Sequence, residues 1–375
     1  MQSIKSAFLF FTLLASPLFA EAPFKAADGL FDTSDLKSLG LKTIKGKHTQ
    51  LYFATEDGYK FCHHPNLVEY RGRLYCMWSN GKMSEDKPGQ RILYCNTADG
   101  KHWTKPTELA NDKDGKGICV ASGFRVVGEQ LIAFYTVTGG TNFNPATALV
   151  ARTSKDGQSW SQPKRITSGF FIEAPRPIHA TQLLLGGEFV GDSRSTKRAR
   201  LLYTSDASGM SGWKESTIQI ANPKNFGYSE PSFFTQSDKT LVVTLRNYSV
   251  FLYGSRSTDG GKTWSNPTQT NFPDTTARTS AGNLPDGTAY LINNSLPKRL
   301  ERGLLSIALS KDGKTFDRAF VLRNEPTKKR YDGEHKRDGW QYPNATIWKG
   351  KFYVAYSINK EDVAITQIEL SELVE

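Results

Sequence analysis

Apolar residues recur along the chain as pairs of short runs, and a few polar or glycine residues join the two runs of each pair. In the first pair, residues 66–70 lead into 74–78, and in the second, residues 124–127 lead into 131–135. Runs of this length, bounded by turn residues, predict antiparallel β-hairpins. Four further hairpins are expected at residues 176–189, 232–245, 281–292 and 345–356. The pattern therefore predicts six copies of one all-β unit and no convincing helix.

A second repeat accompanies the hairpins and has its own turn chemistry. At residues 257–264 the sequence reads Ser-Thr-Asp-Gly-Gly-Lys-Thr-Trp. Aspartate accepts hydrogen bonds from backbone N–H groups, glycine takes a positive φ, and the aromatic residue is free to pack between neighbouring sheets. Close copies occur at 97–103, 154–160 and 310–316, with a degenerate copy at 205–213. A repeat of roughly 50 residues predicts a β-propeller, and these aspartates are expected to be structural.

The repeats organise residues 21–375 as one propeller domain. A strand or two within residues 43–55 is expected to close the ring by joining the last blade, which leaves no free sheet edge. A seventh blade assembled from the two termini stays open as an alternative. The polar segment 324–339 is expected to be a long functional loop. The six blades are expected at about residues 60–110, 118–167, 170–221, 228–271, 277–323 and 340–370.

The first 20 residues have the features of a secretory signal peptide. Lys5 precedes an apolar stretch at 7–15 that is too short to cross a bilayer, and Ala20 and Ala22 offer small residues for cleavage. This pattern predicts a secreted or periplasmic protein without a transmembrane segment. A buried first strand is the alternative.

The formal net charge is +11, from 48 Lys and Arg against 37 Asp and Glu. A basic exported protein attracts polyanions. Because no nucleic-acid motif is present, an acidic polysaccharide or oligosaccharide is favoured as partner over nucleic acid. A solvated basic surface without a partner is the alternative, and the protein is expected to be a monomer.

Four cysteines lie in the first third of the chain and lack a CxxC spacing. Burial as small core residues is favoured over disulfides or a metal site with the neighbouring histidines. No cofactor is expected, although a structural metal stays open. The four are Cys62, Cys76, Cys95 and Cys119.

In a propeller, the residues just before each innermost strand face one common pocket. At these positions the chain carries histidine, arginine, glutamate and tyrosine, which suit proton transfer and carboxylate binding. Alternation along a strand predicts that only one of the two adjacent histidines faces inward. The candidates before the innermost strands are His63, His64, Arg176, Glu230, Arg278, Gln341 and Tyr342, and those at the ends of the second strands are Asn80, Gln90 and Arg246. Each candidate also has a structural alternative to a role in binding or catalysis. Arg246 and Arg278 could form ion pairs with Glu230, and Tyr342 could be a core aromatic residue.

The Asp-containing turn repeats resemble the Asp-boxes of the sialidase superfamily over nearly the whole chain. The fourth blade carries the best match, with Tyr-Ser-Glu-Pro at 228–231 and Leu-Arg-Asn at 245–247. This resemblance implies that Glu230 activates a tyrosine nucleophile, for which Tyr342 is the candidate, and that Arg246 belongs to a carboxylate-binding triad. The first blade departs from the family, because His-His-Pro at 63–65 replaces the expected Arg-Ile-Pro, and no aspartic acid can be assigned as the acid.

The first and last blades are similar to secreted propellers that act on rhamnose-glucuronate linkages, including rhamnose-α-1,4-glucuronate lyases and ulvan lyases. The similarity rests on residues 63–65, 77–81, 87–91, 339–343 and 356–362. It implies cleavage by β-elimination, with His63 or His64 as the base, Arg246 and Arg278 on the carboxylate, and Tyr342 and Gln341 assisting. Only Glu173 and Glu230 are expected as pocket carboxylates, which weakly favours elimination over hydrolysis. A sialidase-like glycoside hydrolase and a non-catalytic glycan-binding propeller are the alternatives.

Overall fold

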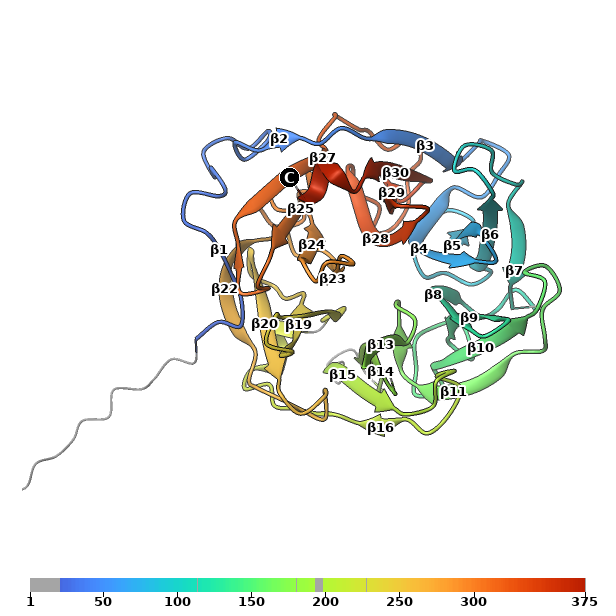
Figure 1. Ribbon diagram of the computed structural model, residues 1–375. Helices are drawn as coiled ribbons and strands as arrows, with labels where there is room; N and C mark the ends of the chain where they lie inside the picture. Colours follow the sequence, from blue (N-terminus) through green and yellow to red (C-terminus); the bar gives the residue numbers. More distant parts are fainter. Residues whose placement is uncertain (1–20, 113, 180, 193–197, 227, 375) are drawn as a thin grey trace, which may run out of the picture.

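The computed structural model describes residues 21–112, 114–179, 181–192, 198–226 and 228–374. The signal peptide expected at 1–20 lies outside these residues. Six antiparallel sheets stand around a central axis like the blades of a propeller, in chain order (Figure 1). The described residues therefore form six blades, and no seventh is assembled from the termini. None of the helices described is long and apolar enough to span a bilayer.

The first three blades are built almost entirely from consecutive strands. The first blade contains β4 (Phe61–Tyr70), β5 (Arg73–Gly81), β6 (Arg91–Thr97) and β7 (Thr107–Ala110). The second contains β8 (Cys119–Val127), β9 (Gln130–Val137), β10 (Ala148–Ser154) and β11 (Lys164–Ser168). The third contains β12 (Phe170–Phe171), β13 (Arg176–His179), β14 (Gln182–Phe189), β15 (Arg198–Thr204) and β16 (Lys214–Glu215).

The last three blades follow the same plan, with additions from the N-terminal segment. The fourth contains β18 (Ser232–Thr235), β19 (Leu241–Leu245), β20 (Phe251–Ser257) and β22 (Thr268–Pro273). The fifth contains β23 (Ser280–Asn283), β24 (Ala289–Asn293), β25 (Leu305–Ser310), β27 (Arg318–Arg323) and the added β2 (Lys42–Thr43). The sixth contains β28 (Trp340–Trp348), β29 (Lys351–Ile358), β30 (Asp362–Glu369) and the added β3 (Lys47–Tyr52).

Short elements complete the described structure. Two small parallel pairs lie between blades: β1 (Lys25–Ala26) with β26 (Thr315–Phe316), and β17 (Thr217–Ile218) with β21 (Thr263–Trp264). The only helical turns in the described residues are η2 (Pro223–Phe226) and α1 (Ser371–Val374).

The ring closes where the two ends of the chain meet. Strand β3 pairs antiparallel with β30, with Lys47 opposite Gln367 and Tyr52 opposite Val363 (Figure 1). The predicted closure by residues 43–55 is therefore confirmed. Because β3 covers the outer edge of β30, the last blade has no unpaired strand edge there.

The aspartate turns have the predicted local structure. Asp156 Oδ1 accepts hydrogen bonds from the backbone N–H groups of Gln158 and Ser159 at 2.8 and 2.7 Å, and Ser154 Oγ donates to the same oxygen. These backbone donors hold the pKa of Asp156 well below its usual range. Gly157 has φ +72°, and a Cβ there would lie 2.3 Å from Tyr75 Oη, so only glycine fits.

The aromatic residue that ends each turn packs between two blades. The ring of Trp160 lies 5.8 Å from that of Tyr94 in the first blade and 6.4 Å from that of Phe124 in the second. Phe316 of the fifth blade contacts Phe234 of the fourth in the same way, at 5.8 Å. The turns therefore fix each blade to the preceding one, as expected for structural elements.

Candidate functional site

The innermost strands β4 and β28 are interrupted where they approach the central axis. In β4 the register with β5 shifts between His63 and Asn66, and His64 has φ +50°. In β28 the register with β29 shifts between Gln341 and Asn344, and Tyr342 has φ +54°. A bulge with a left-handed residue re-aims side chains and is unusual for residues other than glycine.

This interruption overturns the prediction that His63 and His64 point to opposite sides. Both side chains are buried, and their ring centroids lie only 4.1 Å apart. The ring of Tyr342 lies 3.7 Å from His63 and 4.9 Å from His64. Strand alternation fails here because the positive φ at His64 rotates its side chain out of the regular pleat. The three predicted catalytic residues therefore form one cluster.

Tyr342 belongs to a second group of contacts, with two residues of the fourth blade. Its hydroxyl group donates a hydrogen bond to Glu230 Oε1 at 2.7 Å and accepts one from Arg246 Nη1 at 3.0 Å. Arg246 Nη1 also contacts Glu230 Oε1 at 2.7 Å, and Tyr342 and Glu230 are nearly inaccessible to solvent, at 3% and 6% exposure. Glu230 has φ +38°, so it too occupies a strained backbone position.

The electrostatics of this group keep the phenol protonated. Burial and the neighbouring Glu230 carboxylate raise the pKa of Tyr342 well above its usual value. Burial alone would lower the pKa of Arg246, but Glu230 and Tyr342 more than compensate and raise it above its usual value. The site therefore holds a neutral phenol that donates to a carboxylate, beside a permanent cation.

Arg302 adds a second guanidinium group that the sequence did not reveal. It is 3% exposed, its Nη1 donates to Gln341 Oε1 at 2.5 Å, and its guanidinium carbon lies 5.4 Å from the Tyr342 ring centroid. Within the described part of the chain, the Nε groups of Arg302 and Arg246 have no hydrogen-bond acceptor. These buried donors are available to an anionic ligand. Gln341, a predicted binding residue, acts here as the partner of Arg302.

A third group, also missed from sequence, surrounds His63. His63 Nε2 lies 3.1 Å from Glu85 Oε1, and Lys360 Nζ donates to the other oxygen of Glu85. Burial, followed by the positive charge of Lys360, lowers the pKa of His63 to about 3. Burial and His63 also hold the pKa of His64 well below its usual value. Both imidazoles are therefore neutral near pH 7.

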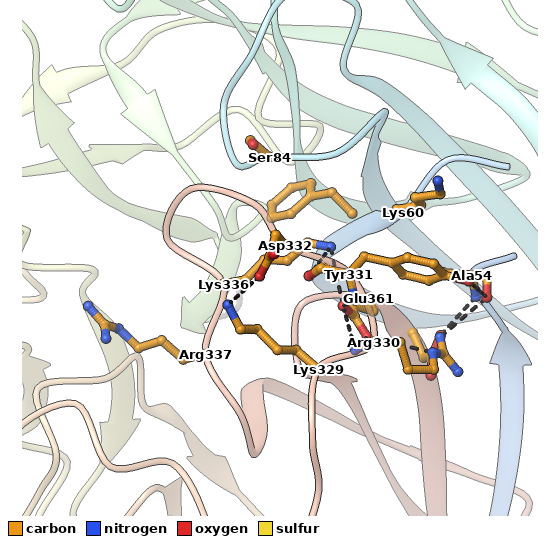
Figure 2. Close-up of polar contacts among 12 residues, drawn as sticks. Ala54, Lys60, Ser84, Lys329, Arg330, Tyr331, Asp332, Lys336, Arg337 and Glu361 are labelled. Carbon is orange, nitrogen blue, oxygen red and sulfur yellow. Dashed lines mark hydrogen bonds and ion pairs between the residues drawn. The ribbon is translucent and has the colours of Figure 1, made fainter. Parts of the chain in front are cut away.

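The turn that carries Lys360 also fixes the wall of the site. Asn359 and Lys360 have φ +57° and +56°, as in a type I′ turn, and Glu361 follows them. The buried Glu361 carboxylate accepts hydrogen bonds from the backbone N–H groups of Arg330 and Tyr331, and Lys336 Nζ lies 3.3 Å from it (Figure 2). Segment 324–339, predicted as a long loop, is thus held against the sixth blade.

The same segment reaches the first blade beside Glu85. The backbone N–H of Glu334 donates to Ser84 Oγ at 3.0 Å, and the Glu334 carboxylate pairs with Lys87 at 2.8 Å. At its other end, Gln341 Nε2 donates to the Arg337 carbonyl. Segment 324–339 therefore supports both Glu85 and Gln341 from outside the site.

Other predicted site residues lie elsewhere. Arg278 is fully buried and pairs with Glu173 Oε1 at 2.8 Å, while Arg176 contacts the other oxygen of Glu173 at 3.4 Å. Glu173 and Arg176 line a separate cavity of about 140 Å³, together with Asn66. Arg278 therefore has an ion pair with Glu173, while its Nε and Nη1 have no partner in the described residues, so its predicted role on a substrate carboxylate stays a prediction.

Asn80 and Gln90, two further predicted binding residues, have structural partners. Asn80 Nδ2 donates to the Phe61 carbonyl at 3.1 Å, and Gln90 Nε2 donates to the Cys119 carbonyl at 3.0 Å. Both side chains are buried and brace the first blade. All four cysteines are buried free thiols, which agrees with the favoured prediction.

The histidine cluster also has donor atoms of the kind that bind divalent metals. Ligand atoms of His63, His64 and Glu85 lie within 4.8 Å of one another. However, the Lys360 ammonium group already holds the Glu85 carboxylate. A metal ion between His63 and the other oxygen of Glu85 would lie beside this internal cation and be repelled by it, so the residues present do not fit a metal site well.

Comparisons with known proteins agree with this architecture. The model of the BNR repeat-like domain family matches residues 72–354. No curated protein matches the chain in sequence. Among solved structures, a sialidase is similar, with a TM-score of 0.66 and 20% sequence identity. The match covers 93% of this chain and 35% of the sialidase chain, so this chain spans about a third of that protein.

Two other solved structures have similar scores. A protein of unknown function from Dyadobacter fermentans has a TM-score of 0.65 and 16% identity, covering 86% of this chain and 99% of its own. The NanB sialidase from Streptococcus pneumoniae has a TM-score of 0.66 and 13% identity, covering 86% and 71%. At these identities the likeness concerns the fold. The chain therefore belongs to the BNR repeat-like domain family and folds as a sialidase-like β-propeller.

Proposed function

We propose that this protein is a glycoside hydrolase acting on an acidic sugar, with Tyr342 as the nucleophile and Glu230 as its base. The observation that carries the proposal is the short hydrogen bond from the Tyr342 hydroxyl group to Glu230, with Arg246 contacting both oxygens. Tyrosine is the nucleophile of sialidases, in contrast to the paired carboxylates of most glycosidases. The similar solved structures include sialidases, which supports this proposal through their fold.

The chemistry follows from charge. A sugar with a carboxylate at its reacting carbon would repel a carboxylate nucleophile, whereas the buried phenol of Tyr342 is neutral before attack. As its oxygen bonds to that carbon, its proton passes to Glu230, 2.7 Å away, and the glycosidic bond breaks, with the leaving oxygen taking a proton from water. A second water molecule then displaces the Tyr342 oxygen from the sugar, and the phenol regains its proton from Glu230. Arg246 and Arg302 would hold the substrate carboxylate through their free N–H groups.

The first blade suggests that the substrate differs from that of a typical sialidase. His63 and His64 occupy the place where the family has an arginine, and they are neutral. Two guanidinium groups instead of three would then face the carboxylate. Acidic oligosaccharides or polysaccharides other than simple sialosides are therefore part of the proposal, and export by residues 1–20 would bring the protein to such glycans.

Product analysis with a panel of acidic glycans tests the proposal. We expect a saturated acidic sugar to be released by the wild type and not by Tyr342→Phe, which preserves the ring but lacks the nucleophilic oxygen. Arg71→Met provides a matched control, because Arg71 is about half exposed and contacts the exposed Glu129 and the ring of Tyr70 rather than the site. Unchanged turnover by Tyr342→Phe would contradict the proposal, and saturable binding without turnover would indicate a glycan-binding propeller.

A rhamnose-uronate lyase is the second candidate, favoured by one observation. His63 is neutral, lies against Tyr342, and its Nδ1 has no partner among the described residues. A neutral imidazole could take the proton next to a uronate carboxylate, while the Tyr342 hydroxyl group protonates the leaving oxygen. A rise in ultraviolet absorbance from unsaturated uronate, with rhamnose-glucuronate glycans or ulvan, would establish this reaction instead.

A further inference from the structure

Three ionisable side chains, of which Lys360 and His63 are buried and Glu85 is mostly buried, form a line beside Tyr342. Lys360, from the turn between β29 and β30, donates to Glu85, and Glu85 contacts His63 Nε2 at 3.1 Å. His63 and Lys360 are 0% and 4% exposed at their side chains, and Glu85 is 13% exposed. The three residues come from the sixth blade, a loop of the first blade and strand β4, so tertiary folding alone brings them together.

This line determines which nitrogen of His63 carries the hydrogen. The pKa of Glu85 is held well below its usual range by Lys360 and His63, against the opposing effect of burial. Glu85 is therefore an anion that only accepts hydrogen bonds. Its oxygen lies 3.1 Å from Nε2 without full hydrogen-bond geometry, and this negative charge favours the hydrogen of the neutral imidazole on Nε2. Nδ1 is then a bare acceptor, buried and without a partner in the described part of the chain.

A buried acceptor without a donor is costly and points to a ligand. The His63 ring lies 3.7 Å from the ring of Tyr342, so a sugar bound for attack by Tyr342 would lie near it. The groups that a sugar offers as donors are its hydroxyl groups. Lys360 also neutralises Glu85, which would otherwise add an uncompensated carboxylate to a site proposed to bind an anion.

We propose that Glu85 and Lys360 are positioning residues that fix His63 with Nδ1 free to accept a hydrogen bond from a hydroxyl group of the bound sugar. The inference rests on the proposed function for the identity of the ligand. Beyond that function, the contact would favour acidic sugars that carry a hydroxyl group within reach of His63 Nδ1. Metal chemistry is not required, because the cation on Glu85 is internal.

The experiment replaces the ion pair by apolar residues of similar size, as Glu85→Leu combined with Lys360→Met. Removing both partners avoids leaving one buried charge, and such exchanges are often neutral for stability. The control is Glu334→Gln, since Glu334 pairs with Lys87 at 2.8 Å on the neighbouring surface, where both are about half exposed. Thermal unfolding of all variants verifies that each is folded.

Nitrogen-15 NMR of histidine-labelled protein reads the tautomer directly, with His63→Gln used to assign the signal. In the wild type and in Glu334→Gln we expect the hydrogen on Nε2 and a bare Nδ1. In the folded double variant we expect a mixture of tautomers. A wild-type hydrogen on Nδ1, or an unchanged tautomer in the double variant, would overturn the inference. This measurement needs no substrate, so it stands or fails separately from the proposed hydrolysis.

Kinetics with substrates that each lack one hydroxyl group test the contact itself. The wild type should disfavour one deoxy substrate by about tenfold or more in kcat/KM, the value of a hydrogen bond lost at a polar site. The double variant should lose about 10- to 100-fold on the full substrate and should no longer discriminate against that deoxy substrate. Equal discrimination by both proteins would contradict the contact, because a merely structural role would leave it unchanged.

Discussion

The neutral, buried state of His63 makes a quantitative prediction about acid stability. In the unfolded chain the imidazole titrates near its ordinary pKa of 6.5, whereas in the folded protein its pKa is lowered to about 3. Between about pH 7 and pH 5 the unfolded state therefore binds nearly one proton that the folded state does not. Linkage then lowers the free energy of unfolding by about 2 kcal/mol over this range.

The direction in which stability changes with pH follows from the lowered pKa of His63. A folded-state pKa below the unfolded value means that the stabilisation is present above about pH 6.5 and is lost as the pH falls toward 3. Glu85 adds nothing between pH 7 and pH 5, because its pKa is lowered well below the ordinary value for a carboxyl group. Replacement of His63 by glutamine removes the titration and leaves an amide N–H that can still donate to Glu85.

Urea unfolding at about pH 7, 6 and 5, followed by tryptophan fluorescence, measures this effect. The difference in unfolding free energy between wild type and His63→Gln should fall by about 2 kcal/mol from pH 7 to pH 5. His335→Gln is the control, since His335 is exposed in segment 324–339. If the difference in unfolding free energy between wild type and His63→Gln stays constant within about 0.5 kcal/mol, the lowered pKa of His63 is wrong, because His63 would then titrate alike in the folded and unfolded chains.

Three further changes test separate parts of the structure. Trp264→Ala should lower the unfolding free energy by about 3–5 kcal/mol, because Trp264 is 6% exposed and packs against Phe233. Urea titration measures this loss, with Leu36→Ala at an exposed position as the control. An equal loss in both variants would argue against the packing role of Trp264. Glu361→Ala should lower the unfolding free energy by about 3–5 kcal/mol, because Lys336 would stay buried without its ion-pair partner. If calorimetry shows no change in stability, other contacts hold segment 324–339. Arg302→Met should raise KM for an acidic glycan about tenfold or more, and an unchanged KM in steady-state assays would remove Arg302 from the carboxylate site.

The propeller could be predicted from sequence because its determinants are local. Each hairpin and each aspartate turn lies within about 50 consecutive residues, and the second blade, expected at 118–167, forms from Cys119 to Ser168. Closure of the ring was also predictable. The strand expected within residues 43–55 belonged to none of the six hairpin units, and the last blade was the place where it could pair. The third blade is less regular, since β12 and β13 divide its innermost strand, and no turn signal in the sequence predicts this division.

The site was only partly predictable because its geometry depends on exceptions to strand periodicity. Alternation separates His63 from His64, and only the positive φ of His64 brings their rings together. The pair Tyr342 and Glu230 was suggested by family resemblance, and their separation of 112 residues gives no local signal.

The residues missed from sequence are held by contacts across blades. Arg302 and Glu85 lie in loops without a recognisable motif, and contacts with Gln341 and Lys360 help to hold them at the site. Lys360 lay within a stretch already singled out for its resemblance, but its role depends on the turn conformation. Residue type alone could not distinguish Arg278, which pairs with Glu173, from Arg246, which contacts Tyr342.

In the proposed hydrolysis, Tyr342 attacks the sugar and carries it covalently. Intact-protein and peptide mass spectrometry after rapid acid quenching of a reaction with an activated acidic glycoside tests this most directly. We expect a mass increase equal to one sugar on the peptide that contains Tyr342, and no such increase in Tyr342→Phe. Turnover of the same glycoside with no adduct on Tyr342, or with an unsaturated uronate as product, would contradict it.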